Sequence, residues 1–154
     1  MKIAIEAVVR ASLSQVWKAW NTPEDILQWN SAQDDWHTTK STVDLREGGQ
    51  FCSRMEAKDG SMGFDFEGTY TCVLPEQRIE YRMTDGREVR VDFVQQAEGV
   101  LVQSVFDAEM ENPPEMQREG WQAILNNFVR HVEAKSSGQS PDSQRAFAHS
   151  AELE

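Results

Sequence analysis

Apolar and polar side chains alternate at the start of the chain. Between residues 2 and 10 the pattern places Ile3, Ile5, Ala7 and Val9 on one face, as expected of a strand with one buried face. Ser12 then suits a helix N-cap and predicts a short helix over residues 13–20. Pro23 predicts the start of a second short helix over residues 23–29. The chain is therefore expected to begin with a strand and two short helices.

From about residue 41 to residue 109 the pattern is that of successive hairpins. Turn-forming residues recur roughly every 10–15 positions, a spacing typical of an antiparallel meander. The predicted turns are Glu47–Gly49, Asp59-Gly60, Pro75–Gln77, Asp85-Gly86 and Ala97–Gly99.

Pairing the strands across these turns collects the apolar side chains on one face. A turn at Asp59-Gly60 places Phe51, Ser53 and Met55 opposite Gly68, Phe66 and Phe64, respectively. A turn at Glu76-Gln77 sets Tyr70, Cys72 and Leu74 against Met83, Tyr81 and Ile79. A three-residue loop around Gly86 sets Met83, Tyr81 and Ile79 against Val89, Val91 and Phe93, and Val102, Ser104 and Phe106 continue the face. Because a one-residue slip would invert every side chain, the agreement favours this register.

The opposite face carries charged side chains and is interpreted as a solvated surface with cross-strand ion pairs. Its members are Arg54, Glu56, Asp65, Glu67, Glu80, Arg82, Glu88, Arg90 and Asp92. In this register Cys72 points to the apolar face and Cys52 to the charged face. Side chains on opposite faces of a sheet are not placed for a disulfide, so two free thiols are expected.

A long amphipathic helix is predicted after Pro113-Pro114, over residues 114–135. Its apolar residues recur at intervals of three and four: Trp121, Ile124, Leu125, Phe128 and Val132. Gly120 within this helix is unfavourable by roughly 1 kcal/mol relative to alanine, so a close approach to the sheet or to a short helix is expected there. We predict one domain over residues 1–135 and a polar, disordered tail over residues 136–154.

The double glycine in Glu47-Gly48-Gly49-Gln50-Phe51 fits three roles: a phosphate cradle, a bulge or a turn. A phosphate cradle requires a helix N-terminus directly after the glycines, whereas Gln50 and Phe51 begin a predicted strand. We therefore expect a tight hairpin turn in which both glycines adopt positive φ.

Composition and charge narrow the classes of partner. The chain has 154 residues, 39% hydrophobic and 27% charged, with a formal net charge of -11. An acidic surface repels nucleic acids and anionic membranes, and no apolar run approaches the roughly 20 residues of a membrane span. The alternating N-terminus is unlike a signal peptide, so a cytoplasmic location is predicted. Two cysteines and three scattered histidines give no metal-binding spacing, and no cofactor is expected.

Several fragments, in order and at matching spacing, resemble the family of activator of heat-shock-protein-90 ATPase homologues, within the START-like or Bet v 1-like (SRPBCC) superfamily. The resemblance covers about residues 3–134 and rests on "VWKAWNTPEDILQW" (16–29), "DLREGGQF" (44–51), "DG" (59–60), "FEGTYTCVLPEQRIEY" (66–81) and "REGWQAILNNF" (118–128). The resemblance implies an α+β helix-grip fold: a curved seven-stranded antiparallel sheet around the C-terminal helix, with two short helices after the first strand. One departure is "GVLVQSVFDAE" (99–109), where the family has a threonine-rich strand.

The resemblance also implies an apolar cavity between the sheet and the long helix. Nine residues are predicted to line it: Trp29, Phe51, Met55, Phe66, Tyr70, Tyr81, Phe106, Trp121 and Leu125. The alternative for each is that it only fills the core. Four hydroxyl groups are expected on the same inward face, and buried hydroxyls need a partner in the protein, in water or in a ligand: Ser53, Tyr70, Tyr81 and Ser104.

Candidates for catalysis are few. The inward set contains no Asp, Glu, His or Lys, which counts against acid–base chemistry, and Asp107 and Glu109 near a strand end have no clear placement. Asp34, Asp35 and His37 are predicted to form a solvated acidic loop near the cavity mouth, whose spacing does not suit a closed metal site. No catalytic or metal-binding residue is predicted.

Three functions follow, in order of preference. The first is binding of an apolar small molecule of lipid, polyketide or aromatic type in the cavity. The second is a cyclase or dehydratase acting on an apolar substrate. The third is a co-chaperone partner of the 90-kDa heat-shock chaperone, as the family name suggests; since a second domain contributes to that activity and only one domain is predicted here, it ranks last.

Overall fold

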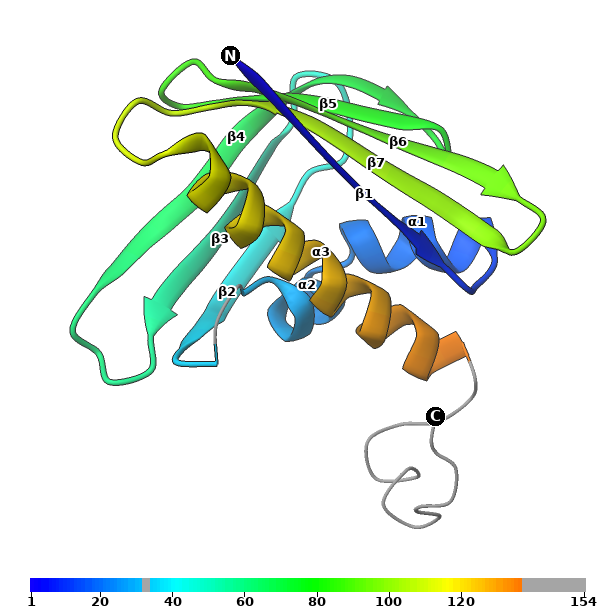
Figure 1. The fold of residues 1–154 in the computed structure, drawn as a ribbon, viewed down its shortest axis with the longest axis horizontal. Coiled ribbons are helices and arrows are strands. Elements are labelled where there is room, and N and C mark those ends of the chain that lie inside the picture. Colours follow the sequence, from blue (N-terminus) through cyan, green and yellow to red (C-terminus); the bar gives the residue numbers. More distant parts are fainter. Residues whose placement is uncertain (32–33, 137–154) are drawn as a thin grey trace, which may run out of the picture.

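An antiparallel sheet of seven strands curls around one long helix in the computed structural model, which describes residues 1–31 and 34–136 (Figure 1). The order across the sheet is β1-β7-β6-β5-β4-β3-β2. In chain order the strands are β1 (Lys2–Val9), β2 (Trp36–Val43), β3 (Gln50–Ala57), β4 (Gly63–Leu74), β5 (Arg78–Met83), β6 (Glu88–Gln96) and β7 (Gly99–Asp107). The predicted helix-grip fold is confirmed.

The three predicted helices are present, with small differences at their ends. They are α1 (Leu13–Asn21), α2 (Pro23–Trp29) and α3 (Pro114–Ser136). Ser12 caps α1 as predicted: its hydroxyl accepts from the Gln15 amide, and the Gln15 side chain accepts from the Ser12 amide. The helix α3 includes Ser136, one residue beyond its predicted end, and the rest of the predicted tail lies outside the described residues. No helix in the described part of the chain has the length and hydropathy to cross a bilayer.

The predicted pairing is confirmed between β3 and β4 and wrong in two other hairpins. Phe51 lies opposite Gly68, and Met55 lies opposite Phe64, as expected. Between β4 and β5 Tyr70 lies opposite Tyr81 rather than Met83, and between β5 and β6 Tyr81 lies opposite Val89 rather than Val91. Both shifts are of two residues, so these side chains keep their predicted face.

A bulge in β4 changes the face of the residues that follow it. The register shifts between Tyr70 and Cys72, so that Cys72 lies opposite Glu80 and Val73 lies opposite Ile79. Cys72 and Leu74 were expected to point inward, but Val73 packs on the core instead and Leu74 is exposed. The prediction of two free thiols is confirmed, although both cysteines lie on the outer face.

The outer face of the sheet is charged and solvated, as predicted. Arginines on it pair with carboxylates on the same or neighbouring strands: Arg54 with Glu56 and Asp65, Arg78 with Glu80 and Asp92, Arg82 with Glu88, and Arg90 with Asp92. Most of these side chains are more than a third exposed, so each pair adds little to stability. The inner face, in contrast, forms the core with α1, α2 and α3.

The helix α3 is tied to the free edge of the sheet at β1. The Arg118 guanidinium donates to the Ala4 carbonyl at 2.7 Å, and the Gln122 side-chain amide donates to the Glu6 carbonyl at 3.2 Å. These side chains occupy carbonyl groups that an edge strand otherwise offers to another chain. Gly120 has open space around the position of a Cβ atom, so the expected close approach of another element to Gly120 is wrong.

The turn at Glu47–Gly49 joins β2 to β3 as predicted, but only one glycine adopts positive φ. Gly48 has a φ of 84°. Gly49 is needed for a different reason, because a Cβ there would collide with the carbonyl oxygen of Asp44. The turn also extends the sheet: the Gly48 amide donates to the Tyr70 carbonyl at 2.8 Å, and the Tyr70 amide donates to the Gly49 carbonyl at 2.9 Å.

Candidate functional site

A cavity of about 440 Å³ lies between the inner face of the sheet and α3. Its walls come mainly from β3, β4, β5 and α3, with contributions from α1 and α2. The volume falls in the range of small-molecule sites. The cavity exists because the sheet is strongly curved and the helix stripe of Trp121, Ile124 and Leu125 fills only part of its concave side.

Eight of the nine residues predicted to line the cavity do lie on its wall: Trp29, Phe51, Met55, Phe66, Tyr70, Tyr81, Trp121 and Leu125. Phe106 is fully buried and lies behind the wall, where its ring stacks on Trp121 with a centroid distance of 3.8 Å and an angle of 11°. Phe106 therefore supports the wall without forming it. Whether the eight residues contact a ligand stays a prediction.

The aromatic rings of the wall hold one another in fixed orientations. Phe51 meets the Tyr81 ring edge-on, with centroids 4.7 Å apart, and Phe66 meets Trp121 in the same manner at 6.2 Å. Edge-to-face contacts of this kind add about 0.5–1.5 kcal/mol beyond the burial of the rings. The contact between Phe66 and Trp121 also joins β4 to α3 across the cavity.

Three hydroxyl groups on the wall are buried and have no hydrogen-bond partner among the described residues. Tyr70, Tyr81 and Ser104 line the cavity and are 6%, 8% and 4% exposed. Burial raises the pKa of both tyrosines, so their hydroxyls stay neutral. The fourth predicted hydroxyl, on Ser53, lies 3.4 Å from the hydroxyl of Ser41 on the neighbouring strand.

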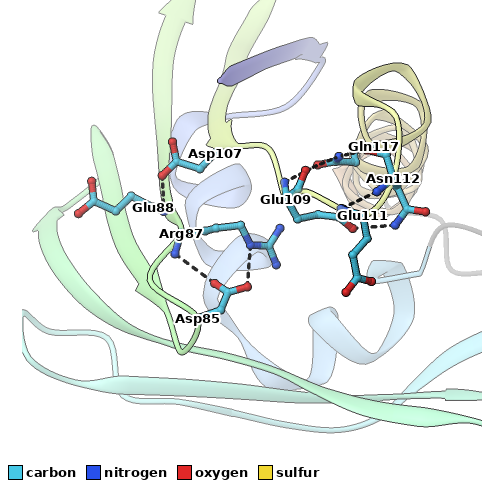
Figure 2. A network of polar contacts seen from close by, with 8 residues as sticks. All are labelled: Asp85, Arg87, Glu88, Asp107, Glu109, Glu111, Asn112 and Gln117. Atoms are coloured by element: carbon cyan, nitrogen blue, oxygen red, sulfur yellow. Dashed lines mark hydrogen bonds and ion pairs between the residues drawn. The ribbon is translucent and has the colours of Figure 1, made fainter.

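Charged residues lie at the mouth of the cavity, beside the β5–β6 turn and the start of α3 (Figure 2). The Arg87 guanidinium donates from Nε to Asp85 at 2.8 Å and extends toward Glu109. The Arg87 backbone amide also donates to Asp85, and these bonds lower the pKa of the Asp85 carboxyl. Arg87, Asp85 and Glu109 all border the cavity.

Glu109 organises the loop that leads into α3. Its carboxylate accepts hydrogen bonds from the backbone amides of Glu111 and Asn112 and from the Asn112 side chain, at 2.6–2.7 Å. The bonds from Asn112 and Glu111 lower the pKa of Glu109, so the group stays ionised at neutral pH. The Gln117 side chain, which is buried, accepts from the Glu109 amide and donates to the carbonyls of Glu109 and Asn112 (Figure 2).

Sequence reasoning did not bring these mouth residues together. Asp85 was assigned only to a turn, Glu109 had no clear placement, and Arg87 and Gln117 were not singled out. The available signal was topological: β5 and β6 share a turn, and β6 and β7 are neighbours, so the end of β7 lies beside that turn. The close approach of Glu109 and Gln117 depends on the path of the loop between β7 and α3. The pattern of apolar residues along the sequence does not predict that path.

The other predicted candidates lie away from the cavity. His37 is in β2 opposite Glu56 on the outer face, not in a loop as expected, and Asp34 and Asp35 are exposed just before that strand. Arg118, at the start of α3, pairs with Glu115. In the described ranges no three His, Cys, Asp or Glu side chains converge as metal ligands.

A buried carboxylate joins α2 to α3 behind the cavity wall. Asp25 is 4% exposed, and its Oδ1 lies 2.7 Å from His131 Nε2 and 2.6 Å from Lys135 Nζ. Burial would raise the pKa of Asp25, but the hydrogen bonds from Lys135 and His131 outweigh burial and lower the pKa. Asp25 is not part of the wall, yet its neighbour Ile26 is, so the pair of helices fixes one side of the cavity.

This geometry can hold a mostly apolar molecule and offer it neutral hydroxyl groups. The carboxylates at the mouth are ionised and already engaged in hydrogen bonds. Asp65 and Glu67 border the cavity too, but they lie opposite Arg54 and Cys52 on the outer face of the sheet. Away from the mouth, the inward-facing side chains of the described wall residues include no group suited to exchange a proton near neutral pH.

Comparison with known proteins agrees with this architecture. The family described as Activator of Hsp90 ATPase homolog 1-like protein matches residues 10–133. The chain belongs to this family. An AHSA1-like protein from Aeromonas hydrophila, solved in solution, is 53% identical; the match covers 88% of this chain and 94% of that one, with a TM-score of 0.83.

Two further solved structures are similar to this member of the Activator of Hsp90 ATPase homolog 1-like family. A protein from Cytophaga hutchinsonii is 42% identical over 90% of this chain and 96% of its own, with a TM-score of 0.76. A protein from Chromobacterium violaceum is 23% identical over 86% of this chain and 98% of its own, with a TM-score of 0.78, and shares the fold. A search of curated proteins found no match.

Proposed function

We propose that this protein binds an apolar small molecule, of lipid, polyketide or aromatic type, in the cavity between the sheet and α3. The support is a cavity of about 440 Å³ whose wall is largely aromatic and aliphatic. Apolar pockets with a few polar groups are the usual form of small-molecule sites. The edge-to-face ring contacts favour a wall that is already formed before the ligand enters.

A thermal-shift and native mass-spectrometry screen against lipids and polyketide-like aromatic compounds tests this function. Ile124 lies on the cavity wall from α3, and Ile124→Trp should occupy part of the cavity. We expect ligands that raise the Tm of the wild-type protein and bind the variant far more weakly. Leu27→Trp is the control, because Leu27 is exposed and the added ring lies outside the cavity. A broad panel that neither binds nor shifts the wild-type Tm would refute the proposal.

An enzyme acting on an apolar substrate ranks second, because ionised carboxylates of Asp85 and Glu109 border the cavity. Both groups are engaged in the hydrogen bonds of their own loops, which supports binding over turnover. A co-chaperone activity rests on the family name alone and ranks third. A pull-down with the 90-kDa heat-shock chaperone and an assay of its ATPase activity test it.

A further inference from the structure

The cavity wall contains hydrogen-bonding capacity that the protein leaves unused. The residues Tyr70, Tyr81 and Ser104 are more than nine-tenths buried, and no other group in the described ranges hydrogen-bonds to their hydroxyls. Elsewhere a buried hydroxyl is satisfied: Thr38 Oγ1 donates to the Asn30 carbonyl at 2.5 Å. Buried hydroxyls without a partner are uncommon and call for water or a ligand.

These hydroxyls lie on the sheet side of the cavity. Tyr70 and Tyr81 are directly opposite each other on β4 and β5, and Ser104 is on β7. Phe51 contacts both tyrosine rings, with centroid distances of 5.3 Å and 4.7 Å. A molecule in the cavity would therefore meet flat aromatic surfaces together with neutral hydroxyl groups that can donate or accept.

The charges around the cavity disfavour an anionic ligand. The mouth places the carboxylates of Asp85 and Glu109 beside a single guanidinium, that of Arg87, which already donates to Asp85. Among the described residues Arg87 is the positive side chain that borders the cavity, and moving an unpaired charge into an apolar site is costly.

We propose that the ligand is a neutral ring compound whose carbonyl or hydroxyl oxygen hydrogen-bonds to Tyr70 or Tyr81, which lie opposite each other on β4 and β5. This inference rests on the proposed function and adds the polar requirement of the ligand. A wholly apolar hydrocarbon leaves the three hydroxyls unpaired, and a carboxylate meets the negative mouth. A ketone or an alcohol on an aromatic frame gives one or two of these hydroxyls a partner without bringing a charge.

A matched series on one ring frame tests the inference by titration followed with amide NMR shifts. The probes are 2-ethylnaphthalene, 2-acetylnaphthalene, 2-naphthol and 2-naphthoate. We expect the acetyl and hydroxyl compounds to bind the wild-type protein about ten-fold more tightly than the ethyl compound, as one or two added hydrogen bonds would give. The carboxylate should bind more weakly than the acetyl compound.

Removal of the hydroxyls should abolish this preference. In the double variant Tyr70→Phe, Tyr81→Phe the acetyl compound should lose about ten-fold in affinity while the ethyl compound is unchanged, and Ser104→Ala should lose less. The unliganded variants should keep the wild-type Tm, because no protein hydrogen bond is removed. Thr38→Val, which removes a satisfied hydroxyl away from the wall, should lower the Tm and leave the ten-fold preference intact.

The outcomes separate this inference from the proposed function. Equal affinity of the ethyl and acetyl compounds for the wild-type protein overturns the inference and indicates that water satisfies the hydroxyls, while the proposed function stands. Tighter binding of the naphthoate also overturns it. Failure of every probe to bind, together with failure of the wider screen, overturns both.

Discussion

At the scale of single residues, the hydrogen bonds around Asp25 connect two helices that are distant in sequence. Asp25 lies in the first turn of α2, and its carboxylate bonds to His131 and Lys135 near the end of α3. Lys135 is 58% exposed in its side chain, whereas His131 is 10% exposed. The bond to His131 is therefore better shielded from water and should carry more of the stabilisation.

Asp25→Asn should lower the free energy of unfolding at pH 7 by about 2 kcal/mol, since it weakens a charged hydrogen-bond acceptor in a buried position. Because the folded-state pKa of Asp25 lies below the usual carboxyl value, the stabilisation is complete above the unfolded-state pKa. It is lost as the pH falls through the folded-state pKa. Urea unfolding of both proteins at pH 7 and at low pH measures the difference, which should shrink in acid.

Glu24→Gln is the matched control for Asp25→Asn. Glu24 is the neighbouring acid in the first turn of α2 and is exposed, so its loss has the same effect on the helix dipole without touching the buried contacts. An Asp25→Asn variant as stable as Glu24→Gln would show that the bonds to α3 contribute nothing measurable.

The two glycines of the β2–β3 turn should respond differently to substitution. Gly49→Ala forces a Cβ against the Asp44 carbonyl and should destabilise the protein by about 2 kcal/mol, as overpacking does. Gly48→Asn should cost less, because Asn tolerates positive φ and no atom lies near the added Cβ. Thermal unfolding of the two variants compares these costs; equal losses would contradict the different roles of the two residues.

Period-two alternation predicted the strand residues of the wall, Phe51, Met55, Phe66, Tyr70 and Tyr81, and the apolar helix stripe predicted Trp121 and Leu125. Phe106 was placed on the wall because alternation gives a face but not a depth. Only the side chains of the opposing helix decide which inward residue is covered, and here Trp121 covers Phe106.

At the scale of elements, the bulge in β4 could not be predicted from the alternation of apolar and polar residues. Cys72, Val73 and Leu74 are three successive apolar residues, so alternation assigns neither face to them. The extra residue between Tyr70 and Cys72 turns Val73 inward and reverses its neighbours. Turn lengths also shift register by two without changing any face, which is why Tyr70, Tyr81 and Val89 kept their predicted face although their pairing was wrong.

Gly120→Ala should stabilise α3. The position is helical, a Cβ there meets open space, and its φ is not positive. The gain should be about 0.5–1 kcal/mol, because alanine loses less backbone entropy on folding. Urea unfolding measures it, with the exposed helix position Glu119→Ala as the control for propensity alone. A loss of stability in Gly120→Ala would mean that the helix needs a flexible point at this residue.

At the scale of the whole molecule, the order of elements and the two amphipathic surfaces sufficed to predict the helix-grip fold. The volume of the cavity did not follow from them. An apolar face and an apolar helix stripe can meet in a filled core or enclose a space. Which of these occurs depends on the curvature of the sheet and on the height at which α3 rests, and both are set by contacts from many residues.

Trp121 is the contact that holds α3 at this height, because it touches both sides of the curved sheet. It stacks on Phe106 of β7 and meets Phe66 of β4 edge-on. Trp121→Ala should lower the free energy of unfolding by about 3 kcal/mol, since it removes a large, partly buried ring. In a double-mutant cycle Trp121→Ala and Phe106→Leu should couple by about 1 kcal/mol.

The control for this coupling is Trp36→Ala. The Trp36 ring contacts Phe64 and not Phe106, so its effect should be additive with that of Phe106→Leu. Additivity of the Trp121 pair as well would mean that the two stacked rings stabilise the fold independently, and that α3 is held over the cavity by other contacts.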